Sequence, residues 1–180
     1  MREFATYQAH GLKITENGID MLIRSVFPVN EEALISSKIV GVFNAENLLA
    51  AYSLLRAIGI ETKVMHDAWI DFTGVPGRLE RVPNNRGITV LVDYAHTEQS
   101  LTAVLQTLQV QSEDLLPNTK YQVPSTNSKI ILVFGATGDR DTTKRLKMGT
   151  VAHELADTIV LTDDDTYTEP SERIIDMVKA

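Results

Sequence analysis

Short apolar runs alternate with helix-like segments in the second half of the chain, and this alternation limits the fold more than any other sequence feature. Three apolar runs, at 88–92, 130–134 and 158–161, are each followed by a segment that favours a helix, at 98–110, 143–156 and 171–178. A strand–helix–strand order implies right-handed crossovers and a parallel sheet covered by helices. We therefore predict an α/β fold whose sheet is incomplete, because an average sheet has about five or six strands.

The first 60 residues follow a different pattern. Apolar and polar positions alternate up to about residue 40, and Asn17-Gly18 is typical of a hairpin turn, so we expect short antiparallel strands. From Asn44 to Ile58, apolar residues recur every three or four positions, and Gly59 is suited to end a helix. A β-rich and helical part therefore precedes the α/β part.

A stretch rich in Gly, Pro and Asn at 71–87 has the composition of a linker. We predict a first domain at 1–74, a linker at 75–87 and a truncated α/β domain at 88–180. The polar stretch from Ser112 to Ser128 is expected to be an exposed, mobile insertion without a function of its own.

Composition excludes several classes of protein. The chain has 180 residues and no cysteine, which excludes disulfides and thiolate metal sites. Its net charge of −7 argues against a general nucleic-acid surface. No apolar stretch approaches the ~20 residues of a membrane span, and the N-terminus lacks the apolar segment of a secretory signal. We expect a cytoplasmic protein that binds neither nucleic acid nor membrane.

The tetrapeptide from Asp93 to His96 follows the first apolar run of the α/β part, where open sheets bind their ligands. Asp93 can accept two hydrogen bonds from a ribose diol, or it can merely favour the positive end of a helix that Thr97 caps. His96 is either a ligand-binding group or a structural hydrogen-bonder. No residue at metal-ligand spacing accompanies it.

A charged, glycine-containing segment, FGATGDRD at 134–141, follows the second run. Its glycines permit either a turn whose amides face an anion or a plain strand-to-helix turn. It matches neither the Walker A loop nor the GxGxxG fingerprint. Arg140 is suited to bind a carboxylate or a phosphate. The supporting charges around it are Asp139, Asp141, Lys144 and Arg145.

Five segments in register, from about Gly41 to the end, resemble the Mur ligase family, and within it the UDP-N-acetylmuramoyl-tripeptide synthetase (MurE) type. They are VFNAENLLAAYSLLRAIGI, PGRLE, VDYAHTEQSL, VFGATGDRDTTKRLKMG and LADTIVLTDDDTYTEP. The resemblance implies the tail of a central ATP-binding domain followed by most of a Rossmann-like C-terminal domain.

The resemblance also implies an activity for the parent protein, that of an ADP-forming ligase of peptidoglycan synthesis. Such ligases use ATP and Mg²⁺ to phosphorylate a carboxylate of a UDP-N-acetylmuramoyl peptide, and the amine of an amino acid then attacks the acyl phosphate. Nucleotide binding would fall to Asn44 and Asn47 near the adenine, to Arg78 from the linker and to Asp93 at the ribose, with His96 undecided.

The amino-acid site implied by the resemblance contains Arg140, which would hold the carboxylate of the incoming amino acid, and Asp164, Asp165 and Tyr167. Relatives that use diaminopimelate have an arginine where Tyr167 stands. The acidic triplet 163–165 can attract a side-chain ammonium, so a lysine-like amino acid is a hypothesis. The alternative is that these aspartates cap a turn.

No GKT or GKS of a Walker A loop occurs in the 180 residues. We therefore expect this chain alone to hold neither ATP nor Mg²⁺ securely and to be inactive, and we assign it no catalytic or metal-binding residue. Two alternatives stand beside the ligase. One is a non-catalytic module that binds a nucleotide or a precursor, and the other is a related ligase of the folylpolyglutamate or cyanophycin synthetase type.

Overall fold

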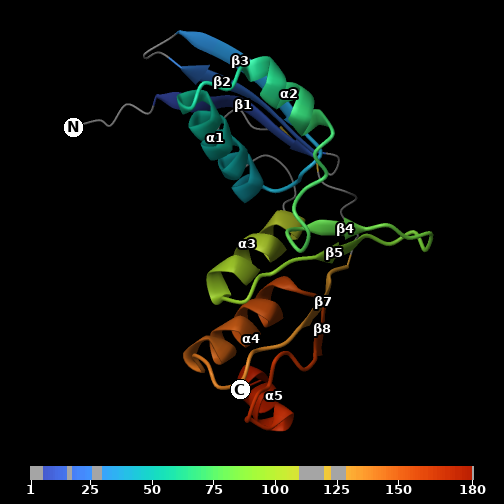
Figure 1. Ribbon diagram of the computed structural model, residues 1–180. Coiled ribbons are helices and arrows are strands. Elements are labelled where there is room, and N and C mark those ends of the chain that lie inside the picture. The colour runs from blue at the N-terminus through green and yellow to red at the C-terminus, as the bar shows by residue number, and fades with distance from the viewer. Residues whose placement is uncertain (1–5, 16–17, 26–29, 110–119, 123–128, 180) are drawn as a thin grey trace. The chain divides into compact units, whose positions relative to one another are not determined.

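The protein forms two compact units in the computed structural model (Figure 1). The N-terminal unit comprises the described residues of 1–93 and 110–124, and the C-terminal unit those of 94–109 and 125–180. The structure describes residues 6–15, 18–25, 30–109, 120–122 and 129–179.

The N-terminal unit contains a sheet with the strand order β3-β2-β1-β6, in which β1, β2 and β3 are antiparallel. Its elements are β1 (Tyr7–Thr15), β2 (Gly18–Ser25), β3 (Glu31–Ser37), α1 (Val42–Ala57), α2 (Thr62–Ile70) and β6 (Lys120–Gln122). Alternate residues of β2, namely Ile19, Met21 and Ile23, are buried against both helices through Leu48 and Trp69, among others. The period of two along this strand therefore places one face on the core.

The antiparallel strands and the helix predicted for this unit are present, and α1 begins two residues before Asn44. Helix α2 was not predicted from the sequence. Its signal is the four-residue spacing of Met65 and Trp69, both of which are buried. Strand β6 was not predicted either, and it pairs in parallel with β1. The other residues of the predicted insertion, 112–119 and 123–128, lie outside the described residues.

A short hairpin ends the N-terminal unit. Strand β4 (Glu80–Val82) pairs antiparallel with β5 (Val90–Val92), and the Asn84 side chain donates hydrogen bonds to the carbonyl oxygens of Val82 and Ile88. The prediction of a buried parallel strand at 88–92 is therefore wrong. The physical reason is exposure: Ile88 and Val92 are 58% and 46% exposed, whereas a parallel strand is covered on both faces.

The C-terminal unit is the predicted α/β part. Strands β7 (Ile131–Phe134) and β8 (Thr158–Leu161) are parallel and in register from Ile131–Thr158 to Phe134–Leu161. The helices are α3 (Glu98–Gln109), α4 (Thr143–Leu155), which is the crossover between the strands, and α5 (Ser171–Lys179). These bounds agree with the predicted ones to within one residue, which confirms the α/β class with a parallel pair.

Two small apolar clusters hold the C-terminal unit together. Leu101 and Leu105 of α3 pack with Met148 of α4, and Ala136 packs with Ile174 and Val178 of α5. Since Phe134 at the carboxyl end of β7 packs against both clusters, this end of the strand is held by three helices. No helix among the described residues is long and apolar enough to cross a membrane.

Candidate functional site

Two loops follow the parallel strands of the C-terminal unit, at 135–142 after β7 and at 162–170 after β8. Carboxyl ends of neighbouring parallel strands meet at one edge of a sheet, the usual ligand edge. The loops are joined by their backbones, because the Gly138 N–H donates to the Asp165 carbonyl at 2.8 Å. A Cβ on Gly138 would collide with the backbone of Thr166, so this approach requires glycine.

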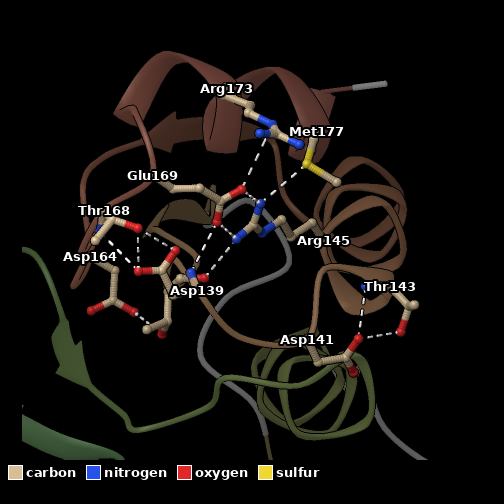
Figure 2. A network of polar contacts seen from close by, with 10 residues as sticks. Asp139, Asp141, Thr143, Arg145, Asp164, Thr168, Glu169, Arg173 and Met177 are labelled. Atoms are coloured by element: carbon tan, nitrogen blue, oxygen red, sulfur yellow. Dashed lines mark hydrogen bonds and ion pairs between the residues drawn. The ribbon is translucent and has the colours of Figure 1, made fainter.

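Asp139 joins the loops a second time. Its carboxylate accepts hydrogen bonds from the Thr168 backbone N–H at 2.9 Å and from the Thr168 hydroxyl at 2.8 Å. In return, the Asp139 N–H donates to Oε2 of Glu169 at 3.1 Å. Figure 2 shows this network between the loops. The Asp139 carboxylate, which the sequence predicts as a supporting charge, therefore binds the neighbouring loop of the protein.

Arg145 carries the third connection, and its side chain is completely buried. Its guanidinium donates to Glu169 Oε1 at 3.0 Å and to Oε2 at 2.5 Å, as well as to the Thr137 carbonyl at 3.0 Å (Figure 2). These hydrogen bonds lower the pKa of Glu169 to about 2, and the same pairing raises the pKa of Arg145. Both groups stay charged at neutral pH.

Arg140 and Tyr167 are exposed residues, one in each of the two loops. The guanidinium carbon of Arg140 lies 5.8 Å from the centre of the Tyr167 ring, within the range of a cation–π contact. Tyr167 has a φ of 49° and Asp139, next to Arg140, has a φ of 51°, a left-handed conformation that costs a residue with a side chain roughly 1–2 kcal/mol. The structure therefore brings together two residues predicted for the amino-acid site.

Two further predicted residues of this edge, Asp164 and Asp141, have hydrogen-bond partners within the protein. Asp164 accepts from the Thr137 hydroxyl at 3.0 Å and from the Asp165 N–H at 2.9 Å, so a turn-capping contact exists for it. Asp141 accepts two hydrogen bonds from Thr143, whose hydroxyl and N–H lower the pKa of Asp141. It therefore caps the first turn of α4.

The residues after Asp93 also form local contacts. Thr97 and Ser100 exchange hydrogen bonds between side chain and backbone N–H, at 3.1 and 3.2 Å, a reciprocal cap of α3. The exposed His96 ring has its Nδ1 3.0 Å from the Tyr94 carbonyl oxygen and meets the Tyr94 ring edge-on. The Lys144 ammonium donates to the His96 carbonyl at 2.8 Å. Helix capping is therefore present here, as the alternative interpretation expected.

The predicted nucleotide-binding residues of the N-terminal unit form two small groups. At the start of α1, the Asn44 amide donates to the Val40 carbonyl at 2.7 Å, and its oxygen accepts from Asn47 at 3.2 Å. In the second group, Asp93 accepts the N–H of Leu79 at 2.9 Å, and the turn so held carries Arg78. Among the described residues, no group of three or more His, Cys, Asp or Glu is arranged to hold a metal ion.

Sequence reasoning missed Thr168 and Glu169, which hold the two loops together. Neither residue follows a helical or strand period, and their only signal was their position within the last of the five resembling segments. The burial of Arg145 was missed as well, because a charge in a cluster of charges reads as a surface residue.

Comparison with known proteins finds relatives that match nearly the whole of this chain. UDP-N-acetylmuramoyl-L-alanyl-D-glutamate–2,6-diaminopimelate ligase of Thermosynechococcus vestitus is 39% identical over 178 residues, which is 98% of this chain and 32% of that protein. A solved structure of a ligase with this name has 29% identity and a TM-score of 0.56, covering 99% of this chain and 33% of its own. The chain thus spans about a third of the length of these relatives.

The fold has a further match in the UDP-N-acetylmuramate–alanine ligase of Thermotoga maritima, with a TM-score of 0.68 and 22% identity over 98% of this chain and 36% of that one. At this identity the likeness concerns the fold alone. Residues 77–180, more than half of the chain, match the family model described as "Mur ligase, glutamate ligase domain". The chain therefore belongs to the Mur ligase family.

Proposed function

We propose that this chain is part of an ATP-dependent ligase of peptidoglycan synthesis. The ligase joins an amino acid to a UDP-N-acetylmuramoyl peptide through an acyl phosphate and forms ADP. The observation that carries the proposal is the locked pair of loops that presents Arg140 and Tyr167 at the carboxyl edge of a parallel strand pair, in a chain of the Mur ligase family. The names of the relatives support the same reaction.

In this proposal the C-terminal unit receives the amino acid. Arg140 binds the carboxylate, since its planar guanidinium can donate two parallel hydrogen bonds to one. Tyr167, Asp164 and Asp165 line the same pocket. The supporting observation is that Arg140 and Tyr167 are exposed neighbours, whereas Arg145 is committed to an internal ion pair.

In the same proposal, residues of the N-terminal unit bind the nucleotide. Asn44 and Asn47 contribute near the adenine, Arg78 reaches the nucleotide from the linker and Asp93 binds the ribose, with His96 as a further candidate. The division into a domain tail at 1–74, a linker at 75–87 and a C-terminal domain at 88–180 is part of the same proposal. The described residues offer no set of ligands that fits Mg²⁺, so we assign no residue to the metal and derive no step through it.

The identity of the amino acid is proposed at the level of its charge. The named relatives act on 2,6-diaminopimelate, which has a second carboxylate. Tyr167 supplies no cation for that group, and Asp163, Asp164 and Asp165 add negative charge beside it. These two observations favour an amino acid with a side-chain ammonium and no second carboxylate, such as lysine.

The experiment uses the ligase encoded by the complete reading frame that contains this chain. The ligase is expressed in a host, recovered from the cytoplasmic extract and purified. ADP release is measured with UDP-N-acetylmuramoyl-L-alanyl-D-glutamate and either lysine or diaminopimelate. We expect release to depend on both substrates and to be greater with lysine. Release with diaminopimelate alone would overturn the assignment of the amino acid, and release with neither would overturn the ligase.

Two further proteins, the 180-residue chain and an Arg140→Ala variant, are measured in the same assay. The 180-residue chain is expected to release no ADP, because it contains no Walker A loop. The Arg140→Ala variant is expected to raise KM for the amino acid, whereas Arg24→Ala, which removes an exposed guanidinium of the N-terminal unit, leaves it unchanged. A related ligase of the folylpolyglutamate type would be revealed by release with a folate, and a non-catalytic module by nucleotide binding without release.

A further inference from the structure

We propose that Arg145 and Glu169 are positioning residues, which hold Arg140 and Tyr167 at a fixed place relative to one another and so form the amino-acid site. This inference rests on the proposed function and adds two residues that touch no substrate. Glu169 belongs to the loop after β8, and Arg145 lies in the first turn of α4, from which its guanidinium reaches both carboxylate oxygens of Glu169 (Figure 2).

One hydrogen bond joins the Arg145–Glu169 pair to the residue before Arg140. Glu169 Oε2 accepts the N–H of Asp139, which is the residue before Arg140, at 3.1 Å. The Asp139 carboxylate in turn accepts hydrogen bonds from Thr168, the residue after Tyr167. Both the backbone N–H and the hydroxyl of Thr168 donate to it. A shift of the Glu169 carboxylate would therefore move both loops together.

The backbone next to the site residues is in a strained conformation. Asp139 and Tyr167 adopt left-handed φ angles of 51° and 49° without being glycine. Such conformations persist only where the surroundings over-determine them, and they concentrate at ligand sites. The hydrogen bonds of Glu169 and Thr168 to Asp139 are the contacts that fix the first of these residues.

Stability alone is a poor explanation for this pair. Burying two charges costs desolvation that their attraction only offsets when the geometry is good, and apolar residues of similar volume serve packing equally well. Within the described residues, Arg145 Nε is moreover buried without a hydrogen-bond partner. An apolar pair could not form two hydrogen bonds that this pair forms. Arg145 donates to the Thr137 carbonyl, and Glu169 accepts from the Asp139 N–H.

The first test measures amide hydrogen exchange in the 180-residue chain by NMR. Arg145→Lys keeps the charge and loses the planar fork, while Glu169→Gln keeps the shape and loses the charge. We expect exchange at Asp139 and Gly138 to accelerate about tenfold or more, and exchange of the Thr162 N–H, which donates to the Phe134 carbonyl between the strands, to accelerate distinctly less. Arg173→Met is the matched control, because this 69% exposed guanidinium is 3.8 Å from the same carboxylate.

The second test measures the kinetics of the complete ligase with the same variants. We expect KM for the amino acid to rise roughly 10- to 100-fold, since misplacement of a binding group by about an ångström has an effect of this size. KM for ATP is expected to stay within about twofold, and Arg173→Met to resemble the wild type.

Three results would overturn the positioning role. The first is unchanged exchange at Asp139 and Gly138 in both variants, and the second is an equal loss of protection at Thr162, which would indicate a purely structural pair. The third is altered exchange with an unchanged KM for the amino acid. A wild-type ligase that uses no amino acid would instead refute the proposed function, and the exchange data would still decide whether the pair fixes the loops.

Discussion

Leu79 donates its backbone N–H to the carboxylate of Asp93, with 2.9 Å between the nitrogen and Oδ2. Leu79 is buried and has a left-handed φ of 46°, so the turn that carries Arg78 is held in a strained shape by this bond. Asp93, which the sequence predicts at a ribose, therefore holds the turn before it. A carboxylate has lone pairs for both tasks.

Replacing Asp93 by Ala removes the acceptor and is expected to open this turn. A hydrogen bond to a charged group is worth about 1.5–3 kcal/mol, so exchange of the Leu79 N–H should accelerate by more than tenfold. Asp93→Asn keeps an oxygen in place and should have a smaller effect. Hydrogen exchange followed by NMR measures both variants, and equal protection of Leu79 in the Ala variant would contradict the assignment.

The N-terminal unit contains a polar cluster that should contribute to its stability. Glu31 accepts hydrogen bonds from the Tyr52 hydroxyl at 2.8 Å, from Thr62 at 2.5 Å and from Arg56 at 2.8 Å. Tyr52→Phe deletes one of these bonds and is expected to lower the free energy of unfolding by about 1 kcal/mol. Urea unfolding followed by the fluorescence of Trp69, the only tryptophan, measures the change.

The control for this cluster is the neighbouring residue. Glu32 forms an ion pair with Arg24 in which both side chains are at least half exposed, so Glu32→Gln should cost roughly 0–1 kcal/mol. Glu31→Gln removes the charge to which Tyr52, Thr62 and Arg56 donate, so it is expected to cost more than Tyr52→Phe. An effect of Glu32→Gln as large as that of Glu31→Gln would show that general surface charge, rather than the cluster, stabilises this unit.

Acid is expected to weaken the C-terminal unit through Glu169. Its folded pKa is about 2, below the ordinary 4.5, because Arg145 and the Asp139 N–H bind the ionised form. A lowered folded pKa contributes stability that is fully present above pH 4.5 and is lost as pH falls toward 2. Thermal unfolding followed by circular dichroism should show Tm falling through this window.

The variant Glu169→Gln separates this group from the other carboxylates. It should be less stable than the wild type at neutral pH, and the difference between the two proteins should shrink as pH falls from 4.5 to 2. A difference in Tm that stays constant across this window would show that the Glu169 charge contributes nothing.

Gly138 should not tolerate a side chain. Its Cβ would collide with the backbone of Thr166, and backbone cannot move aside cheaply, so Gly138→Ala is expected to destabilise the C-terminal unit by about 1–3 kcal/mol. Gly11→Ala is the comparison, because a Cβ there meets no atom within 4 Å, although its φ of 54° still costs roughly 1 kcal/mol. Urea unfolding of each unit, followed by NMR, compares the two.

The Tyr167 ring is expected to orient Arg140. Tyr167→Ala removes the cation–π contact, which is worth about 0.5–1 kcal/mol at an exposed site, and should raise KM for the amino acid about two- to fivefold. Tyr167→Phe retains the ring and should preserve KM. An increase in KM with Phe as large as with Ala would assign the role to the hydroxyl instead.

Local elements were predictable from this sequence because their causes are local. The apolar spacing in 98–110, 143–156 and 171–178 agrees with helices α3, α4 and α5, since a helix satisfies its own backbone. Strands β7 and β8 were predicted as well, as short apolar runs between helices. A strand was predicted at 88–92 as well, and β5 lies within it, but its antiparallel pairing with β4 was not predicted. The partner of a strand lies elsewhere in the chain, and the sequence of residues 88–92 does not specify it.

The candidate site divides in the same way. By itself the sequence determined the α/β class and the family, and it predicted Arg140 and Tyr167 for the amino-acid site, since these are matters of pattern and of side-chain chemistry. Only the tertiary structure decided that Arg145 is an internal residue and that Glu169 is its partner. The physical reason is that an ion pair between a helix and a loop depends on where the two strands place these elements, and no spacing along the chain records that distance.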